Sequence, residues 1–440
     1  MGIARCWNVI TETMPREQLE RLQLNAFRKR VEWAIDNSPF YQKVYRQAGI
    51  EPDDIQTMDD VRRVPLVSKE ELRVAQQAEP YLYGEMLGVP VTELTAYHQT
   101  AGTTGKPLYV TDTYASWQSM VEAFCYNIYA MGLRNTDRVF VAFPYNVFIA
   151  FWVGHYAAEK IGCEVIPGGT MSTRARISKM QEVRATALMC TPTYGLRMIE
   201  VAQEMGIDPA KDLQIRKIIC AGEPMPEATR LKLEQLWGAN VYDHIGTAEV
   251  GPWGYMCDQK KGLHMLESMF LVELLDVETM SRLIQPGEVG VIVITTLFPR
   301  SFPTIRYNLK DLAQLSAREC PCGRTFRLLD SIRGRTDNLT KIKGVLFTPL
   351  SIEEVIRDNF SQIAEFETIV TKVGTQDNLL VKIELDPSVS PQDFLDIRRR
   401  LVEALKFRTN LTFSVEAVPS QTLPRYEFKS ARFKDLRKER

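Results

Sequence analysis

The sequence has no excess of charge of either sign. It contains 54 Lys and Arg against 55 Asp and Glu in 440 residues, a formal net charge of -1. Proteins that hold the nucleic-acid backbone carry a marked positive charge, so the composition argues against a nucleic-acid partner. Hydrophobic residues make up 45% of the chain and charged residues 25%, which is typical of an ordinary globular protein.

Targeting features are also missing from the first residues. The opening MGIARCWNVI lacks the apolar core of a secretory signal. Cys6 stands where N-myristoylation needs Ser or Thr. We therefore expect a cytoplasmic protein.

One long uncharged run raises the question of a membrane span. It extends from Val139 to Ala158 and is long enough to cross a bilayer. However, Pro144, Asn146 and Gly154 interrupt it. The run is better interpreted as a buried strand, a loop and a buried helix, and we expect no membrane partner.

The chain contains eight cysteines and no secretory signal, which indicates a reducing compartment. Three of them, Cys257, Cys320 and Cys322, form a pattern described below. The others lie scattered in apolar surroundings and are expected to be packing residues: Cys6, Cys125, Cys163, Cys190 and Cys220.

The length predicts two or three domains. Apolar spacing indicates a helix over residues 16–35. Short apolar runs then alternate with helix-like segments, at residues 138–143, 163–167, 187–192, 215–222 and 239–246. This rhythm predicts an α/β fold with a mostly parallel sheet flanked by helices. Ligands bind outside the carboxyl ends of such strands, so the informative loops are 144–148, 191–194, 222–224 and 244–249.

The second half of the chain has a different composition. Residues 270–297 predict a β subdomain. After Gly334, strand-like and helical segments predict a small α+β unit of about a hundred residues. The tail 425–440 carries seven Lys and Arg against three Asp and Glu, and we expect a solvated helix end or loop there.

A glycine-rich stretch, QTAGTTGKP at residues 99–107, has the composition of a phosphate-binding loop. It is not a Walker loop. Two residues rather than four separate Gly102 from Gly105, and Pro107 follows Lys106. Taken alone, the stretch fits either a phosphate loop or a flexible surface loop.

Further motifs follow this loop in order. They are AGEP at 221–224, DHIGTAE at 243–249, IRYNLKD at 305–311, GRTDN at 334–338, and Lys429 within PRYEFKSARFKD. Together they resemble the adenylate-forming superfamily, most closely its phenylacetate–coenzyme A ligase branch. The resemblance covers nearly the whole chain.

The resemblance implies a reaction in two steps. A carboxylate oxygen attacks the α-phosphorus of ATP, and pyrophosphate leaves. The sulfur of coenzyme A then attacks the acyl carbon, and AMP leaves. Negative charge grows on the phosphates in the first step, so donors and magnesium are expected around them.

The resemblance also implies roles for individual residues. Glu249 would hold magnesium, and Thr247 would contact the α-phosphate. Lys429 would bridge the acid and the α-phosphate, although Phe428 stands where the family usually has Gly. The residues expected to bind the nucleotide are Thr100, Gly102, Thr103, Thr104, Gly105, Lys106, Gly222, Glu223, Pro224, Asp243, His244, Ile245, Asp311 and Arg335.

A movable C-terminal domain is implied as well. Residues 1–336 would form the adenylation core, and residues 337–440 a mobile domain carrying Lys429. Asp337 would be the hinge. Lys343 and Gly344 would meet coenzyme A after the domain turns.

Aromatic residues near the strand ends suggest an aromatic substrate. Tyr145, Phe148, Phe151, Tyr194 and Gly246 are the expected substrate contacts. The resemblance to the ligase branch implies that Phe148 packs on the ring. The alternative is that these side chains only pack in the core. His155 is expected to be a hydrogen-bonded packing residue, because a carboxylate is ionised at neutral pH and needs no base.

Cys257, His264, Cys320 and Cys322 form a set that can close a structural zinc site. The alternative is unligated thiols. Some members of the ligase branch carry a zinc at this place.

The leading hypothesis is therefore an aryl acid–coenzyme A ligase that uses phenylacetate, benzoate or anthranilate. A close alternative passes the acyl group to the thiol of a carrier protein. A third is a non-catalytic nucleotide-binding or zinc-stapled interaction protein. A homodimer is an open alternative for the assembly.

Overall fold

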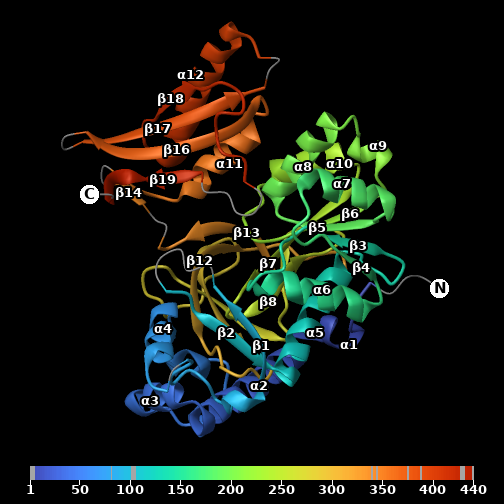
Figure 1. The fold of residues 1–440 in the computed structure, drawn as a ribbon. Coiled ribbons are helices and arrows are strands. Elements are labelled where there is room, and N and C mark those ends of the chain that lie inside the picture. Colours follow the sequence, from blue (N-terminus) through green and yellow to red (C-terminus); the bar gives the residue numbers. More distant parts are fainter. Residues whose placement is uncertain are drawn as a thin grey trace.

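The computed structural model describes residues 5–80, 82–100, 106–337, 340–342, 345–373, 376–386, 389–426 and 432–438. Within them, eleven strands form one central sheet in the order β10-β11-β12-β13-β9-β8-β7-β6-β5-β3-β4. Figure 1 shows helices against this sheet and a separate C-terminal lobe above it. The predicted α/β class is confirmed.

One half of the sheet is parallel. Each of its strands coincides with an apolar run identified in the sequence. The strands are β3 (Arg138–Val141), β4 (Glu164–Pro167), β5 (Ala187–Cys190), β6 (Lys217–Cys220) and β7 (Asn240–Thr247). The connections between them are α6 (Ile149–Ile161), α7 (Thr173–Glu182), α8 (Pro192–Glu204), α9 (Pro209–Asp212) and α10 (Glu227–Trp237). The run from Val139 to Ala158 is thus a strand, a loop and a helix, as expected.

Both faces of the parallel strands are buried, because side chains alternate along a strand. In β3, Val139 and Val141 join the core on one face, and Phe140 joins a second core on the other. Helix α8 begins at Pro192 with Thr191 as its N-cap, whose side chain accepts from the Tyr194 N–H. This cap fixes where the chain leaves the strand end.

The other half of the sheet is antiparallel and contains the predicted β subdomain. Its strands are β8 (Gly251–Met256), β9 (Leu263–Met265), β10 (Phe270–Leu275), β11 (Val289–Thr296), β12 (Tyr307–Leu315) and β13 (Leu328–Arg335). Strand β7 pairs in parallel with β6 and antiparallel with β8. The two halves therefore form one continuous surface.

The N-terminal region packs helices around this sheet. They are α1 (Val9–Glu12), α2 (Arg16–Asn37), α3 (Pro39–Ala48), η1 (Pro52–Asp54), η2 (Asp60–Arg63), α4 (Lys69–Gln77) and η3 (Val91–Glu93). The hairpin of β1 (Leu94–Gln99) and β2 (Tyr109–Thr113) follows, and then α5 (Tyr114–Ala130). Helix α2 confirms the helix predicted over residues 16–35.

The C-terminal lobe has its own apolar core. Four of its strands form a sheet in the order β18-β17-β16-β19, and β14 pairs with β15. Its elements are β14 (Thr340–Ile342), β15 (Val345–Phe347), α11 (Pro349–Asn359), β16 (Ile363–Val373), β17 (Gln376–Leu385), α12 (Pro391–Thr409), β18 (Ser414–Ala417), β19 (Phe433–Asp435) and η4 (Leu436–Lys438).

The basic tail differs from its predicted solvated loop. The Arg432 side chain is 8% exposed and pairs with Glu365 and Glu353. Lys434 pairs with Glu367, and Arg437 with Asp377 and Asp435. The prediction was wrong for Arg432 and Arg437, because acids elsewhere in the lobe, together with Asp435 in the tail, supply their partners.

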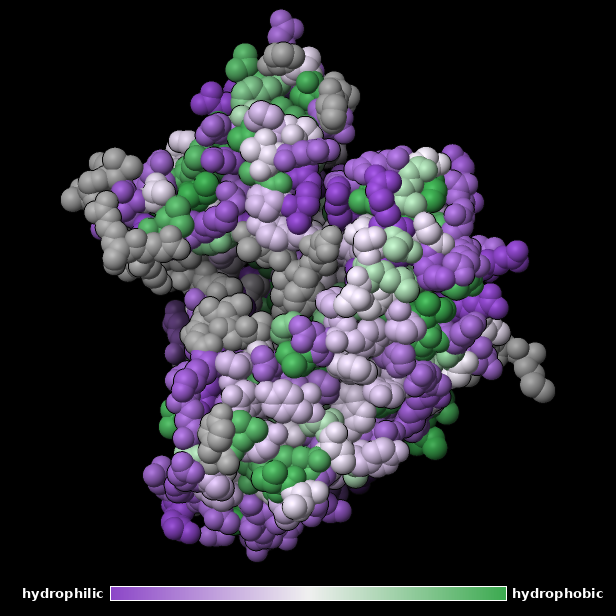
Figure 2. Space-filling model, in the orientation of Figure 1, coloured by the Kyte–Doolittle hydropathy of each residue, from purple (hydrophilic) through white to green (hydrophobic). Residues whose placement is uncertain are grey.

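The face shown in Figure 2 is mostly hydrophilic, with apolar side chains in small patches. No helix in the described ranges is long and apolar enough to cross a membrane.

Candidate active site

The carboxyl ends of β5, β6 and β7 lie side by side in the sheet. Loops 191–194, 222–224 and 244–249 follow these ends. Loop 144–148 follows β3, which is the next strand in the sheet. The four loops that the sequence selected therefore share one edge of the molecule.

A small apolar cavity of about 20 Å³ opens among these strand ends. The Phe143 and Phe151 rings stack with centroids 4.1 Å apart, and Phe124 meets His244 edge-on at 4.6 Å. The remaining walls are aliphatic or small. The full lining is Phe124, Val141, Phe143, Ala150, Phe151, Met189, Ile219, Ala221 and His244.

His244 belongs to this apolar wall. Burial lowers the pKa of its imidazole to about 4, so the ring is neutral near pH 7. The sequence had grouped it with Asp243 and Ile245 on an adenine face. Because alternate residues of β7 point to opposite sides, the His244 ring is turned away from those two neighbours.

The predicted aromatic contacts separate into different environments. Phe151 lines the cavity. Phe148 is the half-buried N-cap of α6, with its ring 6.4 Å from that of Phe151. The Tyr145 hydroxyl lies 2.8 Å from His155 Nδ1, and His155 Nε2 lies 3.1 Å from Glu159, so the imidazole is hydrogen-bonded as expected.

Tyr194 does not face this cavity. It is fully buried in the core on the other face of the sheet. Its hydroxyl lies 3.0 Å from Thr173 Oγ1 and accepts from Arg176 Nη1 at 2.7 Å. The structure therefore places Tyr194 with packing residues, because the start of α8 turns it away from the strand ends.

A turn after β7 carries Gly246, Thr247 and Glu249. An added Cβ at Gly246 would lie 2.8 Å from the Gly251 carbonyl oxygen, so a larger residue would not fit. The β7–β8 register shifts here, as at a β-bulge. The Thr247 hydroxyl is buried without a hydrogen-bond partner, which suits a group that meets a ligand.

Glu249 is buried and partnered by a residue that the sequence did not indicate. Lys69 Nζ lies 2.7 Å from Glu249 Oε1, and the Tyr307 hydroxyl donates to the same oxygen at 3.3 Å. Lys69 is the first residue of α4, whose start is fixed by the Ser68 capping box. The Glu249 carboxylate and the unpartnered Thr247 hydroxyl, two residues apart in the chain, offer the kind of oxygen ligands that magnesium prefers.

Asp311 and Arg335 meet across β12 and β13. Arg335 Nη1 donates to Asp311 at 2.8 Å, while its Nε and Nη2 hold Asp337 at 2.8 and 2.9 Å. Burial raises the pKa of Asp311 to about 6, against the lowering effect of Arg335. One guanidinium thus joins the expected ribose acid to the expected hinge residue.

The AGEP segment follows β6 at the same edge. Gly222 has φ +93°, a conformation that favours glycine. Glu223 Oε1 accepts the Thr193 N–H at 2.6 Å, and Pro224 follows on the exposed surface. The segment is tied to the start of α8.

The glycine-rich stretch connects β1 to β2. Thr100 is buried, and its backbone and hydroxyl close the hairpin on Leu108 at 3.0 Å each. Lys106 is exposed. Several predicted residues lie outside the described part of the chain: Gly102, Thr103, Thr104, Gly105, Lys343, Gly344, Phe428 and Lys429.

The four predicted metal ligands converge. The ligand atoms of Cys257, His264, Cys320 and Cys322 all lie within 4.8 Å of one another. His264 Nε2 is 3.4 Å from Cys322 Sγ, and its Nδ1 is 3.3 Å from the Phe326 carbonyl oxygen. Donation from Nδ1 would leave Nε2 free to ligate. The donor set therefore fits a closed zinc site.

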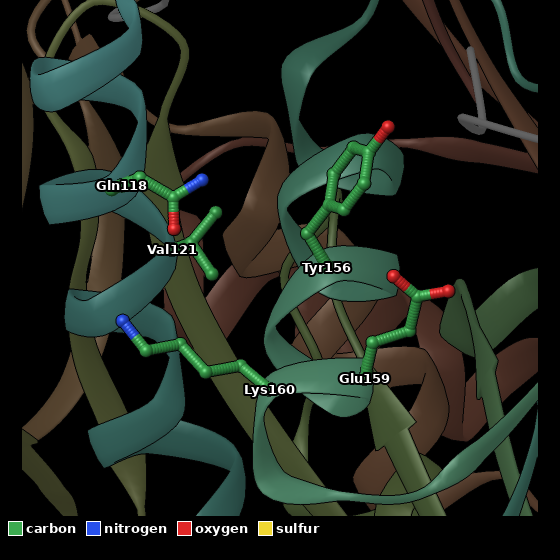
Figure 3. Close-up of a pocket in the computed structure, with 5 residues that line it drawn as sticks. All are labelled: Gln118, Val121, Tyr156, Glu159 and Lys160. Carbon is green, nitrogen blue, oxygen red and sulfur yellow. The ribbon is translucent and has the colours of Figure 1, made fainter.

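A larger hollow of about 360 Å³ lies elsewhere (Figure 3). Only α5 and α6 line it, through Gln118, Val121, Tyr156, Glu159 and Lys160. Glu159 pairs with His155 and Lys160 with Glu122. Among the predicted nucleotide and substrate residues that the structure describes, none lines this surface.

Residues 41–297 match the AMP-binding enzyme family, and residues 344–437 match the AMP-binding enzyme C-terminal domain. The chain belongs to the AMP-binding enzyme family. A phenylacetate–coenzyme A ligase of Aromatoleum evansii is 32% identical over 86% of this chain and 84% of its own. The corresponding ligase of Pseudomonas putida is 31% identical over 97% and 96%.

Solved structures of one 2-hydroxyisobutyryl-CoA ligase are also similar. In the postadenylation state with 2-HIB-AMP, the TM-score is 0.92 at 26% identity, covering 99% of this chain and 93% of that one. In the thioesterification state with CoA, the TM-score is 0.74 at 27% identity with the same coverage. The domain arrangement here therefore resembles the postadenylation state.

The protein is thus an AMP-forming acid–thiol ligase that works through an acyl-adenylate and uses ATP and coenzyme A. This finding sets aside the non-catalytic alternative. Sequence reasoning missed Lys69 and the cavity residues Phe124, Phe143 and Met189. Their place in the chain gave no functional signal, because they reach the site only through the tertiary fold.

The ionisation of Asp243 gives a testable pH dependence. Burial raises its pKa from 3.8 to about 7 in the folded protein. At a pH between these two pKa values, the Asp243 carboxyl is ionised in the unfolded chain but protonated in the folded protein. The free energy of unfolding should therefore fall by about 1.4 kcal/mol per pH unit as the pH rises through this window.

Asp243→Asn removes this titration. The free energy of unfolding should be measured with urea at several pH values between 4.5 and 8. The difference between variant and wild type should shift in favour of the variant as the pH rises to about 7, and should then become constant. A difference independent of pH would contradict the assignment.

Proposed function

We propose that the protein is an aryl acid–coenzyme A ligase. The observation that supports this proposal is the cavity walled by Phe124, Phe143, Phe151 and His244 at the strand ends. Aromatic walls favour a flat apolar ring through stacked and edge-on contacts. A neutral His244 adds no charge that would bind a second carboxylate.

A small branched acid is a second candidate. The cavity is only about 20 Å³ because Phe143 and Phe151 stack closely. A ring would require one of them to shift, whereas a compact acid would require less movement. The structurally similar 2-hydroxyisobutyryl-CoA ligase makes this candidate concrete.

The remaining roles form part of the same proposal. Glu249 would hold magnesium, which would offset the charge of the phosphates, and Thr247 would donate to the α-phosphate. Asp311 and Arg335 would bind the ribose, and the segment 222–224 would line the adenine. The core would span residues 1–336, and the mobile domain residues 337–440.

A panel of acids tests the substrate class. It should contain phenylacetate, benzoate, hydroxybenzoates, anthranilate and 2-hydroxyisobutyrate. Pyrophosphate release measures the first step, and thioester formation with free coenzyme A measures the second. Aromatic acids should give the highest kcat/KM. Preference for 2-hydroxyisobutyrate would favour the second candidate, and adenylation without thioester would favour a carrier-protein thiol.

Phe151 and Phe148 provide a matched test of the cavity. Leucine at either position keeps apolar volume but removes the aromatic face. Phe151→Leu should lower kcat/KM for the preferred aromatic acid by about tenfold, which corresponds to the upper range of an aromatic contact. Phe148→Leu should have a smaller effect, because that ring lies outside the cavity lining.

The KM for ATP should change little in both variants, since Thr247 and Glu249 belong to a different segment. A larger loss in Phe148→Leu than in Phe151→Leu, or an equal rise in the KM for ATP, would refute this placement of the substrate.

We also propose that Cys257, His264, Cys320 and Cys322 bind a structural zinc ion. It would join the segment after β8 to the β12–β13 loop. Arg324 lies in that loop and forms a buried ion pair with Glu12, which ties the N-terminal helix α1 to the same region. The proposed metal has a structural role and takes no part in catalysis.

Protein purified without chelator should contain about one zinc per chain by metal analysis. Cys320→Ser should lower the zinc content and the thermal midpoint, while the adenylation rate of the folded protein changes less. Cys163→Ser, outside the cluster, is the control and should keep its zinc. Metal-free protein from the same preparation would rule out the site.

Lys429 provides the test of the mechanism. In the first step its ammonium would contact the carboxylate and the α-phosphate, so Lys429→Ala should slow adenylate formation by about a hundredfold to a thousandfold. Pre-formed aryl-adenylate and coenzyme A should still give thioester at nearly the normal rate, because the small domain would have turned the lysine away.

Lys434→Ala is the matched control, since Lys434 already pairs with Glu367 within its own lobe. It should retain the first step. Equal losses in both half-reactions of Lys429→Ala, or an unaffected first step, would show that another group stabilises the transition state.

A further inference from the structure

Two arginines flank Lys429 in the sequence, one on each side. Arg425 precedes it by four residues and Arg432 follows it by three. Both side chains are largely buried, with exposed fractions of 21% and 8%. Each one holds an acid of the C-terminal lobe and also reaches toward α8 of the large domain.

Arg432 has the more extensive contacts. Its Nε and Nη2 hold the two Glu365 oxygens at 2.6 and 3.1 Å, and its Nη1 holds Glu353 at 3.1 Å. Its backbone carbonyl accepts the Thr368 N–H at 2.7 Å, where β19 joins β16. These bonds fix the chain immediately after the lysine segment.

The same guanidinium crosses to the large domain. Arg432 Nη2 donates to Thr193 Oγ1 at 3.4 Å. The backbone N–H of Thr193 donates to Glu223 Oε1 at 2.6 Å. Two hydrogen bonds therefore connect Arg432, through Thr193, to Glu223 in the loop proposed to line the adenine.

Arg425 makes the corresponding bridge on the other side. It pairs with Glu384 in β17, and its Nε lies 3.8 Å from Glu200. Thr193 and Glu200 are seven residues apart on α8, so they lie on one face of that helix. In Figure 2, hydrophilic side chains line both sides of the notch between the C-terminal lobe and the helices around α8.

We propose that Arg425 and Arg432 are positioning residues that dock the C-terminal lobe on α8 for adenylate formation only. The proposal rests on the role proposed for Lys429. The contacts occur in a domain arrangement that resembles the postadenylation state, with a TM-score of 0.92 against 0.74 for the thioesterification state. A turn of the small domain about Asp337 would separate both arginines from α8.

The chemistry of the contact suits a reversible bond. The charge of Arg432 is compensated within its own lobe by Glu365 and Glu353, so leaving Thr193 would expose no unpaired buried charge. A hydroxyl bonded to a charged group still contributes enough to bias a population of two orientations. The docked orientation would be favoured without preventing the turn.

Thr193 allows the bridge to be broken without altering the arginine. Thr193→Val keeps the shape and removes the hydroxyl, whereas Thr193→Ser keeps the hydroxyl. Thr193→Val should slow pyrophosphate release in a single turnover by about tenfold, the equivalent of one hydrogen bond to a charged group. Thioester formation from pre-formed adenylate should be unchanged or faster, and Thr193→Ser should restore the first step.

Four results decide the outcome. Normal half-reactions in Thr193→Val would overturn the docking role, and so would equal losses in both steps. If Lys429→Ala abolishes adenylation while Thr193→Val has no effect, the proposed function stands and only the docking role fails. If Lys429→Ala leaves adenylation intact, the lysine assignment fails, and the docking role fails with it.

Discussion

The geometry of the site depends on one buried ion pair. Arg300 and Asp112 have side chains 1% and 0% exposed, with contacts of 2.7 and 3.1 Å. Arg300 Nη1 also donates to the carbonyl oxygens of Glu249 and Val250 at 3.3 and 3.2 Å. Three distant segments therefore meet at one guanidinium: the end of β2, the Glu249 turn and the connection between β11 and β12.

Removing one partner of such a pair leaves a buried charge uncompensated, which typically costs about 3–5 kcal/mol. The pair thus fixes the Glu249 turn relative to the hairpin. A rigid turn matters for the chemistry, because groups that stabilise developing charge must be in place before the reaction.

The interior of each lobe and the contact between the two lobes are stabilised by different interactions. Apolar cores hold each of them together internally, whereas Arg425, Arg432, Thr193 and Glu200 meet where the lobes face each other. Packed apolar surfaces would resist separation, while hydrogen bonds at an interface can be exchanged for water. This division fits an enzyme whose two half-reactions need two domain arrangements.

Much of the fold could be predicted from local patterns. The apolar runs gave β3 to β7 at nearly their observed positions, because buried parallel strands are continuously hydrophobic. The cysteine and histidine spacing also identified four side chains that converge in space. The AGEP and DHIGTAE motifs, at the ends of β6 and β7, likewise lie at the same edge of the sheet.

Tertiary effects explain what the sequence did not reveal. Tyr194 was grouped with the substrate residues, yet the first turn of α8 directs it into the opposite core. His244 was grouped with its neighbours, yet strand alternation turns it into the apolar wall. Lys69 and Arg432 find their partners across 180 and 67 residues, respectively, which no local pattern encodes.

The central claim is that the acyl-adenylate lies across the ends of β6 and β7 and against β12. Hydrogen–deuterium exchange with a non-hydrolysable acyl-adenylate analogue tests it most directly. Residues 221–226, 243–250 and 305–312 should become protected, and the α5–α6 hollow should remain unchanged. Protection confined to the hollow, at residues 118–121 and 156–160, would contradict the account.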